Sequence, residues 1–169
     1  MSIGRGDPFA DPPDARAPVR QFRGRLASGV TVWTAGSVED PSGLTVSSMV
    51  VGEPSTIVGL MNDLTELWDA IQDRGAFVVH ILERKDRNLA DAFAGLRPSP
   101  GGIFAGLDIE DSEWGPILVD IPNRAFCRYL KATEAGYGQL VWGEIGRTET
   151  AELDQPLVNY RGRYQSLAP

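Results

Sequence analysis

The spacing of hydrophobic and polar positions changes several times along the chain, and each change marks a predicted element. Residues 29–35 read Gly-Val-Thr-Val-Trp-Thr-Ala, a run rich in β-branched and aromatic residues that predicts a strand. Residues 44–51 and 56–61 are two more such runs, and the turn-forming residues 52–55 separate them. Together the three runs predict an antiparallel meander.

A helical period, with apolar residues at i, i+3, i+4 or i+7, replaces this pattern in three segments. The segments are residues 19–26, 65–74 and 86–96. Their apolar stripes are Val19, Phe22 and Leu26; Leu64, Leu67, Trp68 and Ile71; and Leu89, Phe93 and Leu96. Gly75, directly after the second segment, is a typical helix stop. We therefore expect three short amphipathic helices.

Further strands are predicted in the second half of the chain, at residues 77–82, 123–134, 138–148 and 157–160. The second and third of these predict a long hairpin. Residues 103–122 carry only short apolar pieces and are predicted as a loop with isolated strand pieces, and residues 161–164 as a tail. Six or seven strands, interrupted by two or three helices rather than alternating with them, favour a closed antiparallel β-barrel with added α over a doubly wound parallel sheet.

Size and composition indicate one ordinary globular domain. A chain of 169 residues, 42% hydrophobic and 23% charged, is long enough to bury a core without metal or disulfide help. Residues 1–18 hold four prolines and are predicted to form a flexible arm, which leaves residues 19–169 as the folded domain.

Charge and cysteine content limit the classes of binding partner and the cellular compartment that we expect. The net charge of −7 repels phosphate backbones at long range, so we expect no nucleic-acid partner. The single cysteine rules out an internal disulfide, and residues 1–18 resemble neither a signal peptide nor a transit peptide. No stretch approaches the roughly 20 apolar residues of a membrane helix. A cytoplasmic protein is the expectation.

The side chains offer little catalytic chemistry. His80 is the only histidine, so a two-histidine metal site is impossible, and its place in an apolar strand favours a packed or hydrogen-bonded role over catalysis. Cys127 lies in an alternating strand, and Arg128 beside it points to the opposite face, so nothing there lowers the pKa of the thiol. We expect no catalytic side chain and no metal.

Residues 43–48, Gly-Leu-Thr-Val-Ser-Ser, are more informative. A glycine followed by small hydroxyl residues lets main-chain and side-chain donors approach a flat, acceptor-rich ring. The same residues are also common on half-exposed strands that bind nothing, so this segment alone leaves both interpretations open.

The order of several segments resembles the flavin reductase family, whose members adopt the FMN-binding split barrel. The matching segments are residues 27–34, 43–48, 77–82 and 89–94, and a last stretch that runs from residues 156–158 to Arg163 and Tyr164. The resemblance therefore spans about residues 19–167. It implies a homodimer that holds FMN or FAD near the subunit boundary, takes hydride from NADH or NADPH, and passes the electrons onward, with a monooxygenase as a candidate partner. The flavin supplies the redox chemistry, which suits a chain without a convincing acid, base or nucleophile.

The resemblance also implies a set of binding residues. Around the isoalloxazine ring and its polar edge it places Ser28, Thr45, Val46, Ser47 and Ser48. At the ribityl or phosphate groups it places Asn62, Asp63, Leu64 and Thr65, with Phe93 flanking the ring and Arg163 and Tyr164 on the nicotinamide side. Each has a plainer alternative: Thr65 as an ordinary first helix residue, Phe93 as a core aromatic, and the last two residues as a solvated tail.

The chain departs from the family pattern at three places. The family often has Asp-Pro-Pro after the Ser-Ser strand, where this chain has Val-Val-Gly-Glu-Pro-Ser at residues 50–55. It often has Gly-Asp-His in the late hairpin, where this chain has Tyr-Gly-Gln at residues 137–139, and His80 replaces an asparagine. We therefore keep three hypotheses: an NAD(P)H-dependent flavin reductase, a flavin carrier or sequestering protein of the same fold without nucleotide turnover, and a structural dimer that has lost flavin.

Overall fold

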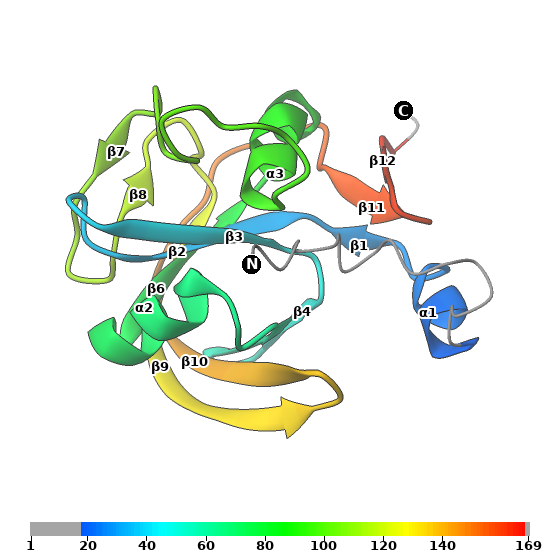
Figure 1. Ribbon diagram of the computed structural model, residues 1–169, viewed down its shortest axis with the longest axis horizontal. Helices are drawn as coiled ribbons and strands as arrows, with labels where there is room; N and C mark the ends of the chain where they lie inside the picture. The colour runs from blue at the N-terminus through cyan, green and yellow to red at the C-terminus, as the bar shows by residue number, and fades with distance from the viewer. Residues whose placement is uncertain (1–17, 168–169) are drawn as a thin grey trace, which may run out of the picture.

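The computed structural model describes residues 18–167, so the arm predicted for residues 1–18 lies, apart from Pro18, outside the described residues. Three helices and twelve strands follow one another in this part of the chain (Figure 1). The helices are α1 (Pro18–Arg23), α2 (Glu66–Arg74) and α3 (Arg87–Phe93), with a 3₁₀ turn η2 (Arg84–Asp86) directly before α3. The strands are β1 (Ser28–Gly29), β2 (Thr31–Gly36), β3 (Pro41–Val46), β4 (Met49–Gly52), β5 (Thr56–Met61), β6 (Ala76–Ile81), β7 (Ile109–Glu110), β8 (Ile117–Leu118), β9 (Arg124–Ala135), β10 (Gly138–Glu149), β11 (Val158–Tyr160) and β12 (Arg163–Gln165).

Seven strands form one antiparallel sheet in the order β3-β2-β6-β9-β10-β5-β4. The sheet curls so that its two edge strands approach each other. Only two residues, 47 and 48, join β3 to β4, and the hydroxyl of Thr31 on β2 lies 3.4 Å from the sulfur of Met49 on β4. The prediction of a mainly β, antiparallel barrel with a few helices is confirmed.

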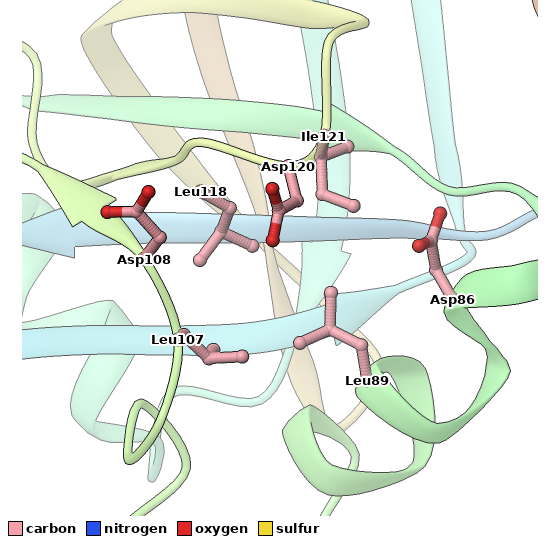
Figure 2. Close-up of a pocket in the computed structure, with 7 residues that line it drawn as sticks. All are labelled: Asp86, Leu89, Leu107, Asp108, Leu118, Asp120 and Ile121. Atoms are coloured by element: carbon pink, nitrogen blue, oxygen red, sulfur yellow. The ribbon is translucent and has the colours of Figure 1, made fainter.

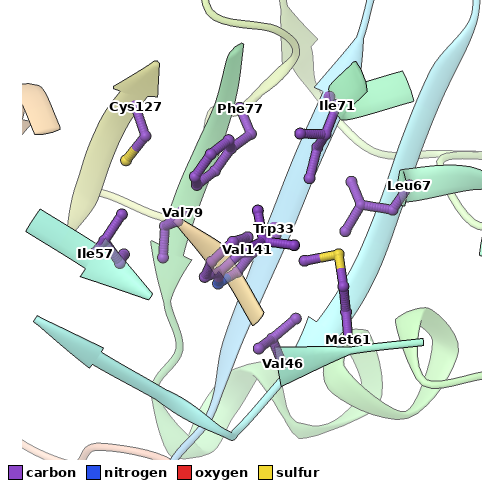
Figure 3. Close-up of a cluster of buried hydrophobic side chains, with 11 residues drawn as sticks. Trp33, Val46, Ile57, Met61, Leu67, Ile71, Phe77, Val79, Cys127 and Val141 are labelled. Carbon is purple, nitrogen blue, oxygen red and sulfur yellow. The ribbon is translucent and has the colours of Figure 1, made fainter. Parts of the chain in front are cut away.

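The inside of the curled sheet is filled by an aromatic pair and the aliphatic side chains around it (Figure 3). Trp33 and Phe77 stack with ring centroids 4.7 Å apart and planes 6° from parallel. Gly59 makes room for the indole, because a Cβ there would lie 2.5 Å from Cη2 of Trp33. Helix α2 closes this side of the barrel by burying Leu67 and Ile71 in the same cluster.

Local sequence explains why α2 begins and ends where it does. Thr65 caps it by accepting a hydrogen bond from the amide of Trp68 at 3.3 Å, and Gly75 ends it in the left-handed conformation at φ 72°. The predicted end at Arg74 is confirmed, and the helix begins one residue later than predicted because Thr65 is its cap. Leu64 was predicted on the buried stripe, but it precedes the cap and is 85% exposed.

A second apolar cluster joins α3 to the end of the chain. Val30, Leu82, Phe93 and Leu157 are among its buried members, and Tyr164 packs against it. The predicted tail is wrong at this point, because residues 163–165 form β12, which pairs with β11 and through it with β1.

Other sequence predictions need smaller corrections. The apolar stripe of α1 is exposed rather than buried, and α3 ends at Phe93, which leaves Leu96 exposed. Residues 103–122 contain the short strands β7 and β8, as the isolated strand pieces had indicated. Within residues 18–167, no helix is long and apolar enough to cross a membrane.

Candidate functional site

Ser28, Ser47 and Ser48 lie at one end of the barrel, the serine end. The β2–β3 ladder ends at the pair Thr31 and Val46, so the chain before β2 and the chain after β3 leave the sheet at the same end (Figure 1). The carbonyl of Ser48 accepts a hydrogen bond from the amide of Leu60 at 2.8 Å, which fixes this connection beside the end of β5.

In the 43–48 segment, Gly43, Thr45 and Val46 contact other parts of the protein. A Cβ on Gly43 would collide with the ring of Phe93, so this glycine makes room for a core aromatic rather than for a flat ligand. The hydroxyl of Thr45 donates to the carbonyl of Ala90 on α3 at 2.7 Å. Val46 is 3% exposed, and its side chain lies in the barrel core. Ser47 is half-buried and Ser48 is exposed, and their hydroxyls remain as the candidate donors of this segment.

The loop before α2 is arranged by its own hydrogen bonds. The side-chain oxygen of Asn62 accepts from the amide of Leu64 at 2.8 Å, and the hydroxyl of Thr65 donates to the carbonyl of Asn62 at 2.9 Å. The amide of Gln139, on the late hairpin, reaches Asp63 at 3.5 Å. This loop presents the N-terminus of a nine-residue helix, whose free amides suit a phosphate group.

Phe93 takes the plainer of its two roles. It is 2% exposed and meets Phe104 edge-on, with ring centroids 5.0 Å apart. In the described part of the chain the ring packs in the second apolar cluster, as expected of a core aromatic, and its predicted place beside the flavin stays a prediction.

Tyr164 belongs to an ordered sheet that also holds Ser28. Ser28 pairs with Asn159, and Asn159 pairs with Tyr164, so the three residues form one row across β1, β11 and β12. Burial, with a smaller contribution from the nearby Asp91, raises the pKa of Tyr164 to about 12. The phenol is therefore neutral at physiological pH. Arg163, next to it, is exposed.

His80 is a structural residue. Its Nδ1–H donates to the carbonyl of Val32 at 3.1 Å, and its Nε2 accepts from the amide of Leu118 at 3.0 Å, which fixes the neutral tautomer. Burial lowers its pKa to about 3. The hydrogen-bonded role predicted from sequence is confirmed, and the ring has no proton to exchange near neutral pH.

Cys127 is equally inert. Its side chain is fully buried, and burial raises the pKa of its thiol to about 12, whereas Arg128 points outward and pairs with Glu144. Among residues 18–167, no group of three or more acidic, histidine or cysteine side chains is placed to hold a metal ion.

One hollow of about 160 Å³ lies beside α3 (Figure 2). Its floor is apolar and its rim is acidic. The lining residues are Asp86, Leu89, Leu107, Asp108, Leu118, Asp120 and Ile121. It is smaller than the usual 300–1,000 Å³ of a small-molecule site. Its lining offers three carboxylates and no side-chain hydrogen-bond donor for a phosphate, so this hollow does not suit a flavin nucleotide.

The serine end fits the flavin that the sequence resemblance implies better than this hollow does. Ser47 and Ser48 offer neutral hydroxyls for the polar edge of a ring, and the start of α2 offers amides for a phosphate. Leu64, in the loop before α2, has an exposed side chain that offers an apolar contact.

Comparison with known proteins gives a consistent result. A family model described as flavin reductase like domain matches residues 23–168. A reductase component of a 4-nitrophenol 4-monooxygenase/4-nitrocatechol 2-monooxygenase from Rhodococcus opacus is 29% identical over 157 residues, covering 91% of this chain and 82% of the relative. The NADH-dependent FMN reductase AsuE2 from Streptomyces nodosus subsp. asukaensis is 31% identical over 157 residues, covering 90% and 85%.

Solved structures agree. The crystal structure of nitrilotriacetate monooxygenase component B from Mycobacterium thermoresistibile superimposes with a TM-score of 0.78 at 28% identity, covering 89% of this chain and 87% of that one. Because the family model spans most of the chain and the fold agrees with it, this protein belongs to the flavin reductase like domain family.

Proposed function

We propose that this protein is a flavin reductase that takes hydride from NADH and supplies reduced flavin to a monooxygenase. The observation that carries the proposal is the match of the flavin reductase like domain over residues 23–168. Two named activities among the relatives, an NADH-dependent FMN reductase and the reductase component of a monooxygenase, support the reaction and the partner.

The chain's own residues bind and orient the reactants. Ser47 and Ser48 would donate hydrogen bonds to the polar edge of the flavin ring, and Ser28 lies at the same end of the barrel. The loop 62–65 and the first amides of α2 would hold the ribityl chain and the phosphate. The bound flavin supplies the hydride acceptor. No side-chain acid or base is needed, which agrees with the inert His80 and Cys127.

A homodimer completes the proposed site. Val50, Val51 and Leu64 are exposed apolar side chains beside the serine end, and Val19 and Phe22 on α1 are also exposed. Apolar surface of this kind is costly in water and is commonly covered by a partner. A second copy placed over it encloses the flavin between subunits. The lone cysteine supports the cytoplasm as the compartment.

A second candidate is a flavin carrier that does not oxidise pyridine nucleotide. It rests on the late hairpin, where the chain has Tyr-Gly-Gln at residues 137–139 instead of the family's histidine-bearing turn. Tyr137 at this turn is fully exposed.

Anaerobic mixing distinguishes the two candidates. The purified protein is loaded with FMN or FAD, mixed with NADH or NADPH, and followed by the visible absorbance of the flavin. Bleaching of flavin supplied in large molar excess over the protein, at a catalytic rate, supports the reductase. Flavin binding without bleaching refutes turnover and leaves the carrier, and absence of binding refutes both.

A further inference from the structure

A second, smaller hollow of about 70 Å³ lies between the start of α3 and the C-terminal hairpin, and its character is basic rather than acidic. It is lined by Arg84, Arg87, Leu157, Tyr164, Gln165 and Ser166. Neither arginine belongs to the set of binding residues that the sequence indicated.

The walls of this hollow are fixed to each other by the main chain. The amide of Arg84 donates to the carbonyl of Gln155 at 2.9 Å, and the amide of Leu157 donates to the carbonyl of Leu82 at 2.9 Å. The helical wall and the hairpin wall therefore keep their spacing without a ligand, which lowers the cost of binding one.

Two guanidinium groups lie on the same side of the helical wall. Arg84 begins η2 and Arg87 follows it by three residues, and side chains three apart on a 3₁₀ turn eclipse each other. Across residues 18–167, neither group forms an ion pair with a carboxylate. Lys85, between them, is paired with Glu83 at 2.8 Å.

The remaining charges leave the hollow open to an anion. Asp86 is occupied elsewhere, because its Oδ2 accepts from the amide of Glu83 at 2.9 Å and it lines the acidic hollow. Asp91 is the nearby carboxylate, and it interacts with Tyr164. The neutral hydroxyl of Ser166 and the amide of Gln165 add hydrogen-bond donors.

The hollow also adjoins the proposed flavin site. Tyr164 shares its strand row with Ser28, and α3 carries both Arg87 and Ala90, whose carbonyl accepts the hydroxyl of Thr45. Arg87 and Ala90 are about one helical turn, or roughly 5 Å, apart along the axis. A ligand that reaches from the serine end past α3 would meet the two arginines.

Resting on the proposed function, we propose that Arg84 and Arg87 bind the pyrophosphate of a dinucleotide whose redox ring lies at the serine end. Guanidinium groups bind phosphate oxygens through paired, charge-assisted hydrogen bonds, and a hollow of this size holds a phosphate group but not a ring. The dinucleotide is the pyridine nucleotide, because the proposed function already assigns the flavin phosphate to the start of α2.

The test compares Arg84→Gln and Arg87→Gln with Lys85→Gln as the matched control, which removes the same charge from the neighbouring position. Binding of inorganic pyrophosphate is measured by calorimetry, so that the site is tested even in a protein that does not oxidise NADH. We expect each arginine variant to weaken binding by about tenfold, the usual cost of one charged hydrogen bond, and the control to stay near wild type. Equal weakening in all three variants overturns the proposal, as does unchanged binding in the arginine variants or absence of binding in the wild type.

Two further measurements on the same variants identify the dinucleotide. A tenfold rise in the KM for NADH with FMN as the flavin, at unchanged affinity for both flavins, supports the pyridine nucleotide. A tenfold loss of FAD affinity at unchanged FMN affinity would assign the hollow to the adenylate half of FAD and would overturn the proposal. If neither quantity differs from that of Lys85→Gln, the arginines do not bind a dinucleotide. Circular dichroism spectra that match the wild type exclude misfolding of the variants.

Discussion

His80 offers the sharpest test of how the buried polar groups of this barrel stabilise it. The folded state holds the imidazole neutral, with a pKa of about 3, whereas in the unfolded chain its pKa returns to about 6.5. The unfolded state therefore takes up a proton first as the pH falls. Stability from the neutral ring is fully present above about pH 6.5 and is lost progressively between there and about pH 3.

The magnitude follows from these two values. Between about pH 7.5 and pH 5.5 the unfolded histidine becomes protonated while the folded one does not, which costs about 1.4 kcal/mol of the free energy of unfolding. Most carboxylates titrate below this window, and the chain has no other histidine to add to the change. Substituting His80→Asn keeps a donor and an acceptor at the same position but removes the titration.

The assay is urea denaturation, followed by tryptophan fluorescence, of the wild type and His80→Asn at both pH values. We expect the wild type to lose about 1.4 kcal/mol more than the variant on going to about pH 5.5. A third variant, His80→Leu, leaves the carbonyl of Val32 and the amide of Leu118 unpaired, and we expect it to cost about 2–6 kcal/mol relative to the wild type at about pH 7.5. Equal pH dependence in the wild type and His80→Asn would show that the folded protein does not hold the imidazole neutral.

Three other substitutions or reagents test the fold and the site. Gly59→Ala places a Cβ against the stacked indole of Trp33, and we expect a loss of about 1–3 kcal/mol in urea denaturation; an unchanged midpoint would contradict the packing. Thr65→Ala removes the cap of α2, so it should cost about 1 kcal/mol and weaken FMN binding in a fluorescence titration, whereas full FMN affinity would exclude this helix end from the site. Cys127 should not react with an aromatic disulfide reagent until the protein unfolds, because its thiol is buried with a raised pKa; rapid reaction in the native state would show that the barrel opens there.

Elements with strong local signals were predictable from the sequence. Helix α2 has an apolar period, a capping threonine and a terminal glycine, and the β9–β10 hairpin has two long runs around a glycine turn. These signals are contained within each segment. The boundaries of both elements therefore needed no knowledge of the rest of the fold.

Features that depend on contacts between distant segments were not predictable in this way. Strand β12 exists because β11 offers it an edge, and nothing in Arg-Tyr-Gln at residues 163–165 alone distinguishes a strand from a tail. The glycine at position 43 suggested close approach to a ligand, but the group that approaches it is Phe93, fifty residues later in the chain. The basic hollow was not predictable for the same reason, since Arg84 and Tyr164 come together only in the folded chain.

The central claim is that flavin binds at the serine end of the barrel, and one titration tests it directly. FMN fluorescence is measured against the wild type, Ser47→Tyr, and the control Ser37→Tyr, which adds the same side chain at the β2–β3 turn, the opposite end of that hairpin. We expect the wild type and Ser37→Tyr to bind FMN with equal affinity, and we expect Ser47→Tyr, although folded, not to bind it. Unchanged FMN affinity in Ser47→Tyr would contradict the placement of the site.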